Sequence, residues 1–225
     1  MRTIITGWSR GGLSFIKTLL ELSGNTVGTN FDRLLTEKDL TSVLANTQDI
    51  EVSSAVLPFL NNLEFNDVTK IFITRDPMRV INSLMFHNRF NINSPYTAFM
   101  HDNVRTIVKS VNPLITTCAH IYHWWDLINN QVYGKPNFIK LEEHPAYILK
   151  GLNQADSKII YNVKNIPYVP GTLNSSYCKQ LITPSGLPVE FKDYIVNLLQ
   201  YLKYHEKVWL PRGGHAHYVT PEWHI

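Results

Sequence analysis

Hydrophobic and polar positions along the chain switch repeatedly between a strand pattern and a helix pattern. Short runs of consecutive apolar residues at 2–7 and 69–74 predict strands that are buried on both faces. Apolar residues at helical spacing follow each run and predict helices at 12–23 and from Pro77 onward. The apolar stripes consist of Leu13, Ile16, Leu19 and Leu20 in the first helix and Val80, Ile81, Leu84 and Met85 in the second. Strands that alternate with helices predict a parallel sheet covered on both faces.

Weaker patterns extend this α/β alternation over the rest of the chain. The further strands expected are 26–28, 51–57 and 136–141, and the further helices are 36–45, most of 95–132 and 191–204. The first of these helices opens with Thr36-Glu37-Lys38-Asp39, which resembles a capping box. Prolines and glycines predict an irregular loop at 162–188. No internal repeat is visible, so we expect a single domain over 1–225, with a C-terminal tail at about 211–225.

Composition agrees with one folded domain. Of 225 residues, 44% are hydrophobic and 17% are charged, which provides a core and is unlike the composition of disordered chains. The net charge of +3 comes without a run of Lys and Arg, so we do not expect a nucleic-acid partner. Cys118 and Cys178 form neither a disulfide framework nor a zinc motif. Because no apolar run approaches roughly 20 residues and the first strand starts almost at Met1, we expect a cytoplasmic protein without a membrane span or signal peptide.

The loop between the first strand and the first helix has the spacing of a phosphate-binding loop. Gly7, Gly12 and Ser14 match the pattern G-x-x-x-x-G-K-[ST]. Leu13 stands in place of the lysine, and Arg10 is the cation of this loop. Amides at a helix start lack intrahelical partners and lie at the positive end of the helix dipole, so they favour an anion. Since the lysine that reaches the β- and γ-phosphates is missing, we expect an anionic nucleotide other than an ordinary triphosphate.

A second candidate site begins where the strand at 69–74 ends. Arg75 lies at the carboxyl end of that strand, the edge where open α/β sheets bind ligands. Asp76 and Pro77 suit the cap and first position of the following helix. Ser83 lies two turns into that helix, so the Arg75 guanidinium and the Ser83 hydroxyl together are suited to bind a second phosphate.

The two stretches together resemble the paired motifs of the sulfotransferases that use 3′-phosphoadenosine 5′-phosphosulfate (PAPS). In that family a loop G-x-x-[RK]-[ST]-G-[ST]-[ST] binds the 5′-phosphosulfate, and a later R-[DN]-P-x-x-x-x-x-S binds the 3′-phosphate. The matching residues are Gly7, Arg10, Gly12 and Ser14 in the first motif and Arg75, Asp76, Pro77 and Ser83 in the second. Gly11 and Leu13 depart from the family pattern, which usually has hydroxyl residues there. The resemblance is confined mainly to residues 1–90.

This resemblance implies a three-layer P-loop-like α/β fold with a central, mostly parallel sheet. It also implies transfer of a sulfuryl group from PAPS to a hydroxyl or amine of a small-molecule or glycan acceptor, with PAP as the product and no metal. The residues implied in cofactor binding are Arg10, Gly11, Gly12, Leu13, Ser14, Arg75 and Ser83. Arg10 is the candidate for stabilising the negative charge that develops on the leaving phosphate.

The general base is less evident in the sequence. The cytosolic branch of the family supplies a histidine shortly after the strand that precedes R-[DN]-P, but residues 53–58 contain no titratable side chain. Other branches use a carboxylate after the second strand, where Asp32 is the nearest analogue. Glu37, His87 and Asp102 are alternatives, and an ordinary loop carboxylate is the simpler interpretation of Asp32.

Three further clusters have a possible function and a simpler structural explanation. His120 and His123 have a spacing that can hold a metal, but half-exposed histidines of a packed helix are the better interpretation, so we expect no metal site. The segment 212–217 resembles a late basic glycine loop of the family, although a mobile tail is favoured. Aromatic residues that suit either an acceptor pocket or the core are Phe86, Phe90, Tyr96, Phe99 and Tyr122.

Two other functions are compatible with the same residues. A kinase of small substrates would use Arg10 in place of the missing lysine and would need magnesium and ATP. A nucleotide-binding protein without catalysis would explain why no histidine occupies residues 53–58.

Overall fold

A five-stranded parallel sheet forms the centre of the computed structural model. The structure describes residues 2–37, 39–62, 65, 67–90, 93–104, 110, 112–131, 137–141, 145–152 and 182–202. The strands are β1 (Thr3–Gly7), β2 (Val27–Gly28), β3 (Ile50–Val52), β4 (Thr69–Thr74) and β5 (Asn137–Lys140). Their order is β2-β3-β1-β4-β5, and every neighbouring pair is parallel. The central β1 pairs Ile5 with Val52 of β3 on one side and with Ile71 of β4 on the other.

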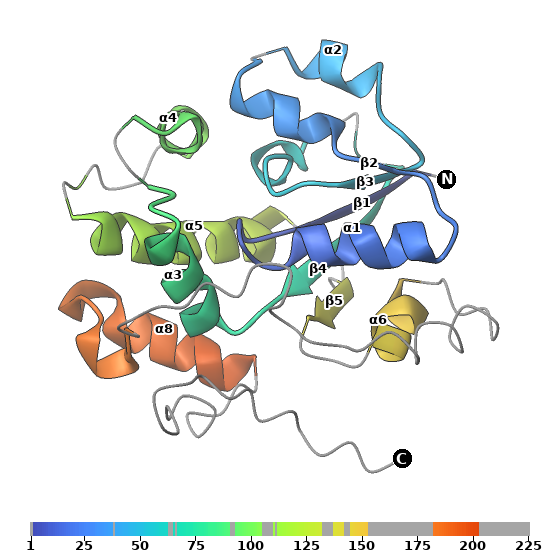
Figure 1. Ribbon diagram of the computed structural model, residues 1–225. Helices are drawn as coiled ribbons and strands as arrows, with labels where there is room; N and C mark the ends of the chain where they lie inside the picture. Colours follow the sequence, from blue (N-terminus) through green and yellow to red (C-terminus); the bar gives the residue numbers. More distant parts are fainter. Residues whose placement is uncertain are drawn as a thin grey trace.

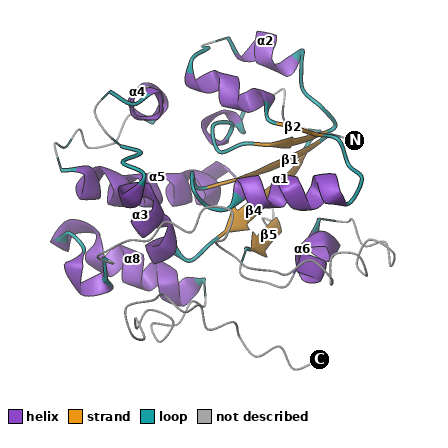
Figure 2. Cartoon of the chain, in the orientation of Figure 1, coloured by secondary structure: helices purple, strands orange, loops and turns teal. Residues whose placement is uncertain are grey.

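Helices cover both faces of this sheet (Figures 1 and 2). The helices are α1 (Leu13–Leu22), α2 (Leu40–Leu44), α3 (Pro77–Phe86), α4 (Pro95–Asn103), α5 (Pro113–Gln131), α6 (Pro145–Gly151) and α8 (Val189–Tyr201), and the 3-10 helices are η1 (Asn30–Leu35), η2 (Leu57–Phe59) and η5 (Pro184–Gly186). Figure 1 shows α1 and α6 on one side of the sheet and α3, α5 and α8 on the other. Of the helices described, none is both long and apolar enough to cross a membrane.

Consecutive strand residues face opposite layers, as the pleat of a strand requires. Ile5 packs with the buried side chains of α1 and α6, whereas Ile4 packs with those of α3, α5 and α8. In β4, Ile71 and Ile73 belong to the first cluster and Phe72 to the second. The expected three-layer α/β architecture with a parallel sheet is therefore confirmed.

The connections between strands position the candidate site. The chain runs from β1 to the edge strand β2, returns to β3, and then crosses to β4 on the far side of β1. The loops after β1 and β4 therefore lie next to each other at the carboxyl edge, where the direction of connection reverses. Ligands bind at such a reversal in open α/β sheets.

Several predicted elements differ from the structure in their bounds. The helix expected at 36–45 begins only at Leu40, because Asp39 rather than Thr36 is its cap: the Asp39 carboxylate accepts a hydrogen bond from the Thr41 amide. The strand expected at 51–57 ends at Val52, since the Ser53 hydroxyl accepts from the Ala55 amide and turns the chain. The helical region 95–132 divides into α4 and α5, while η1 and α6 were not predicted.

Parts of the chain that carried predictions lie outside the described residues. They are the segment 162–181 of the expected irregular loop, Cys178, and the tail with the basic segment 212–217. At the end of that loop, the structure has the single turn of η5.

Candidate anion-binding site

The loop that follows β1 is shaped by two close contacts. Gly7 approaches the backbone carbonyl of Ile73 in β4, so a side chain at Gly7 would overlap it. Gly12 has a left-handed backbone (φ 94) and lies against the Leu141 side chain, which leaves no room for a Cβ atom. Arg10 is also left-handed (φ 64), which is strained for a residue with a side chain. Strain of this kind concentrates at binding and catalytic sites.

The start of α1 presents unpaired amides. The helix has no side-chain cap and no acidic residue in its first turn. The Gly11 amide donates to the carbonyl of Trp8 at 2.8 Å and is thus already engaged in the turn. No described residue accepts a hydrogen bond from the amides of Gly12, Leu13 or Ser14. These three amides are suited to an anion, as are those of other helix starts.

The Arg10 side chain leaves this loop and reaches α3. Its Nε donates to the Ser83 hydroxyl at 3.1 Å, and its NH2 lies 2.6 Å from Nε2 of His87. Residues more than 70 positions apart in sequence are thereby joined. The two motifs predicted from the sequence, one after β1 and one after β4, meet at this contact.

Arg75, which follows β4, also contacts the β1 loop. Its NH1 donates to the backbone carbonyl of Arg10 at 2.9 Å, so one arginine supports the backbone of the other. Its neighbour Asp76 is buried and accepts from the Met78 amide at 2.9 Å, which confirms the predicted cap of α3. We refer to Arg10, Arg75, Ser83 and His87 as the arginine cluster.

Burial and neighbouring positive charges act together on Arg10 and His87. Burial lowers the pKa of Arg10, and the charges of Arg75 and Arg89 lower it further. Burial, Arg10 and Arg89 likewise lower the pKa of His87, so this imidazole is neutral at pH 7 and its Nε2 accepts a hydrogen bond from the guanidinium. No carboxylate among the described residues forms an ion pair with Arg10. A bound anion would relieve this repulsion.

Asp32 lies on the other side of the β1 loop, in η1 after β2. The Ser53 hydroxyl, at the end of β3, donates to its Oδ1 at 2.6 Å. The residue as a whole is exposed, although its carboxyl group is engaged by the Ser53 hydroxyl. Burial raises the pKa of Asp32, while the Ser53 hydrogen bond and the Arg89 charge oppose the rise. Asp32 is therefore held in place by a neighbouring strand, as a proton acceptor requires.

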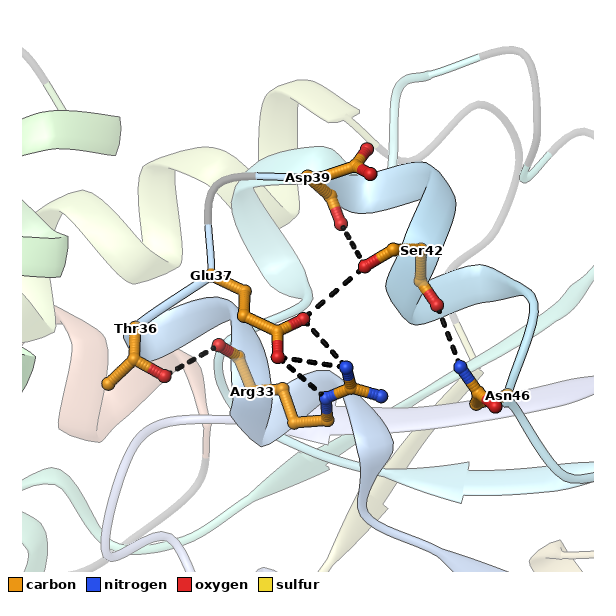
Figure 3. Close-up of polar contacts among 6 residues, drawn as sticks. All are labelled: Arg33, Thr36, Glu37, Asp39, Ser42 and Asn46. Atoms are coloured by element: carbon orange, nitrogen blue, oxygen red, sulfur yellow. Dashed lines mark hydrogen bonds and ion pairs between the residues drawn. The ribbon is translucent and has the colours of Figure 1, made fainter.

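Glu37, one of the alternative bases, belongs to a separate group of polar residues. Figure 3 shows this surface network, which consists of Arg33, Thr36, Glu37, Asp39, Ser42 and Asn46. The Arg33 guanidinium forms a two-pronged contact with the Glu37 carboxylate, with NH2–oxygen distances of 2.8 and 2.9 Å. The Ser42 hydroxyl donates to the same carboxylate. Glu37 is thus engaged at the surface, and Asp102 occupies an exposed position of α4. Of the alternatives, only His87 contacts Arg10.

His120 differs from the expectation of a half-exposed side chain. It is fully buried, because α5 is covered by α3 and α8, and it packs against Phe90, Tyr96 and Trp124. Neither ring nitrogen has a hydrogen-bond partner, and burial lowers its pKa to about 3. Within the described ranges, no three potential ligands lie close enough to hold a metal ion.

Four of the five aromatic candidates for an acceptor pocket separate into two groups, and the fifth, Tyr122, is partly buried against Tyr194 of α8. Phe90, Tyr96 and Phe99 are buried in the core, as the simpler explanation predicted. Phe86 is exposed and packs edge-on against His87, which places it at the rim of the arginine cluster.

Arg89 is the residue near this site that the motifs did not indicate. It lies six positions beyond Ser83, outside R-[DN]-P-x-x-x-x-x-S, and its charge acts on Arg10, His87 and Asp32. Only the folded chain relates it to the other arginines.

Comparisons with family models, with curated proteins and with solved structures found no significant match to this chain. The geometry offers guanidinium groups, a hydroxyl and helix-start amides at one sheet edge, which suit an anion with more than one charged group.

Proposed function

We propose that the protein is a sulfotransferase that moves a sulfuryl group from PAPS to a hydroxyl or amine of a small-molecule or glycan acceptor. The contact between Arg10 and Ser83 carries this proposal, because it joins the loop suited to the 5′-phosphosulfate with the helix suited to the 3′-phosphate. Three features support it further: the unpaired amides at the start of α1, the left-handed Arg10 and the like charges around it.

The proposed chemistry assigns different tasks to the two sides of the β1 loop. The acceptor oxygen forms a bond to sulfur, while the bond from sulfur to the bridging oxygen breaks and leaves its electron pair on the phosphate of PAP. Arg10 would stabilise that negative charge, as a fixed cation does without giving up a proton. The acceptor proton would pass to Asp32, whose raised pKa favours proton uptake.

His87 is better suited to orient Arg10 than to act as the base. It contacts the Arg10 guanidinium at 2.6 Å and therefore lies on the side of the leaving group, where proton removal from the acceptor has no use. Asp32 lies toward β3, across β1 from β4 and α3, and is positioned by Ser53. This division agrees with in-line attack, in which acceptor and leaving group lie on opposite sides of sulfur.

Calorimetry with PAP, PAPS and ATP tests the proposal. PAP should bind with a submillimolar Kd, and Arg75→Ala should weaken it by about 10- to 100-fold, the range for losing a hydrogen bond to a charged group. Arg33→Ala is the matched control, because Arg33 has its own carboxylate partner at the surface, and it should leave PAP binding unchanged. Magnesium-dependent binding of ATP without binding of PAP would favour a kinase instead. PAP binding without transfer of labelled sulfate to any acceptor would favour a nucleotide-binding protein that lacks catalysis.

A further inference from the structure

We infer that Arg89 is a third arginine of this site and that it binds the sulfuryl oxygens while the group is transferred. The inference rests on the proposed function for the identity of the group, but the oxyanion chemistry of Arg89 can be tested by itself. Three observations carry it: the turn that places Arg89 two residues after His87, the surroundings of its guanidinium, and the effect of its charge on both Arg10 and Asp32.

The end of α3 reverses the chain immediately before Arg89, two residues after His87. Asn88 has a left-handed backbone (φ 46) and donates its amide to the carbonyl of Met85. The Arg89 amide donates to the carbonyl of Leu84 at 3.1 Å. These two bonds form a Schellman motif, in which a left-handed residue closes the helix and reverses the chain. Arg89 is therefore placed by the backbone rather than by a flexible surface loop.

The protein holds the Arg89 guanidinium but leaves its Nε without a hydrogen-bond partner. Its Cζ lies 4.7 Å from the centre of the buried Tyr96 ring, which holds the planar group by a cation–π contact. Its Nε is buried and has no hydrogen-bond partner. Within the described part of the chain, Arg89 forms no ion pair. A buried N–H without an acceptor is unfavourable, particularly in a charged group.

The charge of Arg89 reaches residues on both sides of the proposed reaction. Its charge acts on Arg10 and His87, which lie on the side of the leaving group, and on Asp32, which lies on the side of the acceptor. The sulfur atom passes between these two sides. Guanidinium groups bind tetrahedral oxyanions through two parallel N–H bonds, which the two terminal nitrogens of Arg89 can offer, since only its Nε is buried without a partner. A sulfuryl group supplies oxygens of this kind.

Inorganic sulfate, PAP and PAPS are the probes for this inference. Sulfate affinity, measured by calorimetry, should fall by about 10- to 100-fold in Arg89→Gln. The control Arg33→Gln should retain the affinity of the natural protein, and circular dichroism checks the fold of both. Arg89→Lys keeps the charge but removes the planar fork, so it should also lose sulfate affinity and provides a second variant if Arg89→Gln does not fold. PAP lacks the sulfuryl group, so its Kd should change less than about threefold while turnover of PAPS falls about 10-fold or more.

The outcomes separate this inference from the proposed function. Equal sulfate affinity in the natural protein and in both Arg89 variants overturns the role of Arg89, whether or not PAP binds. Loss of PAP binding equal to the loss of turnover overturns it too, since Arg89 would then hold the nucleotide itself. Arg89-dependent sulfate binding in a protein that binds neither PAP nor PAPS supports an oxyanion site at Arg89 and overturns the sulfotransferase proposal.

Discussion

Two arginines of this protein occupy opposite kinds of surroundings. In the surface network, Nε and NH2 of Arg33 both donate to the Glu37 carboxylate, and each partner is partly exposed. In the arginine cluster, Arg10 donates hydrogen bonds to a hydroxyl and a neutral imidazole, and the charges that act on it are those of Arg75 and Arg89. The first arginine is satisfied by its own chain. The second is held in a strained backbone among like charges.

This difference indicates where an external anion belongs. A cation that is paired at the surface gains little from a ligand, because it already has a carboxylate. Cations that crowd together around unpaired helix amides gain a good deal, because the anion relieves their repulsion and satisfies the amides at once. Three predictions test this difference between paired and unpaired side chains, in order of decreasing expected effect.

Arg10→Ala should lower the turnover of PAPS by about 100-fold or more, the loss typical of removing one stabilising group from a developing negative charge. It should weaken PAP binding much less, because the charge on the leaving oxygen develops fully only in the transition state. Sulfate transfer and calorimetry with PAP measure the two effects. Arg33→Ala should change neither, and an equal loss of turnover and binding in Arg10→Ala would show that Arg10 serves binding alone.

His120 is another side chain without a partner, but it lies in the core, where neither ring nitrogen has a hydrogen bond. Burial lowers the pKa of His120 from 6.5 to about 3. Between these pH values the imidazole is protonated in the unfolded chain and neutral in the folded chain. Stability should therefore be full above pH 6.5 and decline as the pH falls toward 3, by about 3 kcal/mol of unfolding free energy at pH 4. Urea unfolding at pH 7 and pH 4 measures this loss. His120→Phe should reduce it, whereas His123→Phe, at a half-exposed position one turn away, should retain it.

The surface network should contribute least. The Arg33–Glu37 pair lies four residues apart on the surface, and such pairs contribute about 0.3–0.5 kcal/mol. A double-mutant cycle with Arg33→Ala and Glu37→Ala should give a coupling energy in that range, and the energy should fall further in high salt. A coupling above about 1.5 kcal/mol would mean that the contrast with the arginine cluster is smaller than the structure suggests.

The elements with strong local signals could be predicted from the sequence. The apolar runs of β1 and β4 and the stripes of α1 and α3 depend on spacing within one segment, and the Asp76 cap with Pro77 depends on adjacent residues. The helix η1 was missed because its start is held from a distance: the buried Glu51 carboxylate accepts from the backbone and side-chain amides of Asn30. The half-exposed state expected for His120 was wrong because α3 and α8 cover its helix, which no pattern within α5 records.

The candidate site also has one part that could be predicted from the sequence and another that depends on the fold. The sequence by itself determined that glycines, an arginine and an uncapped helix start follow β1, and that an arginine and a serine follow β4, since each set depends on neighbours along the chain. Only the tertiary structure decided that Arg10 reaches Ser83 and His87 and that Arg89 joins them. The physical reason is the parallel pairing of β1 with β4, which brings together two loops more than 60 residues apart in sequence. Charges that are unremarkable along the chain become, at that edge, neighbours that repel one another and favour an anion.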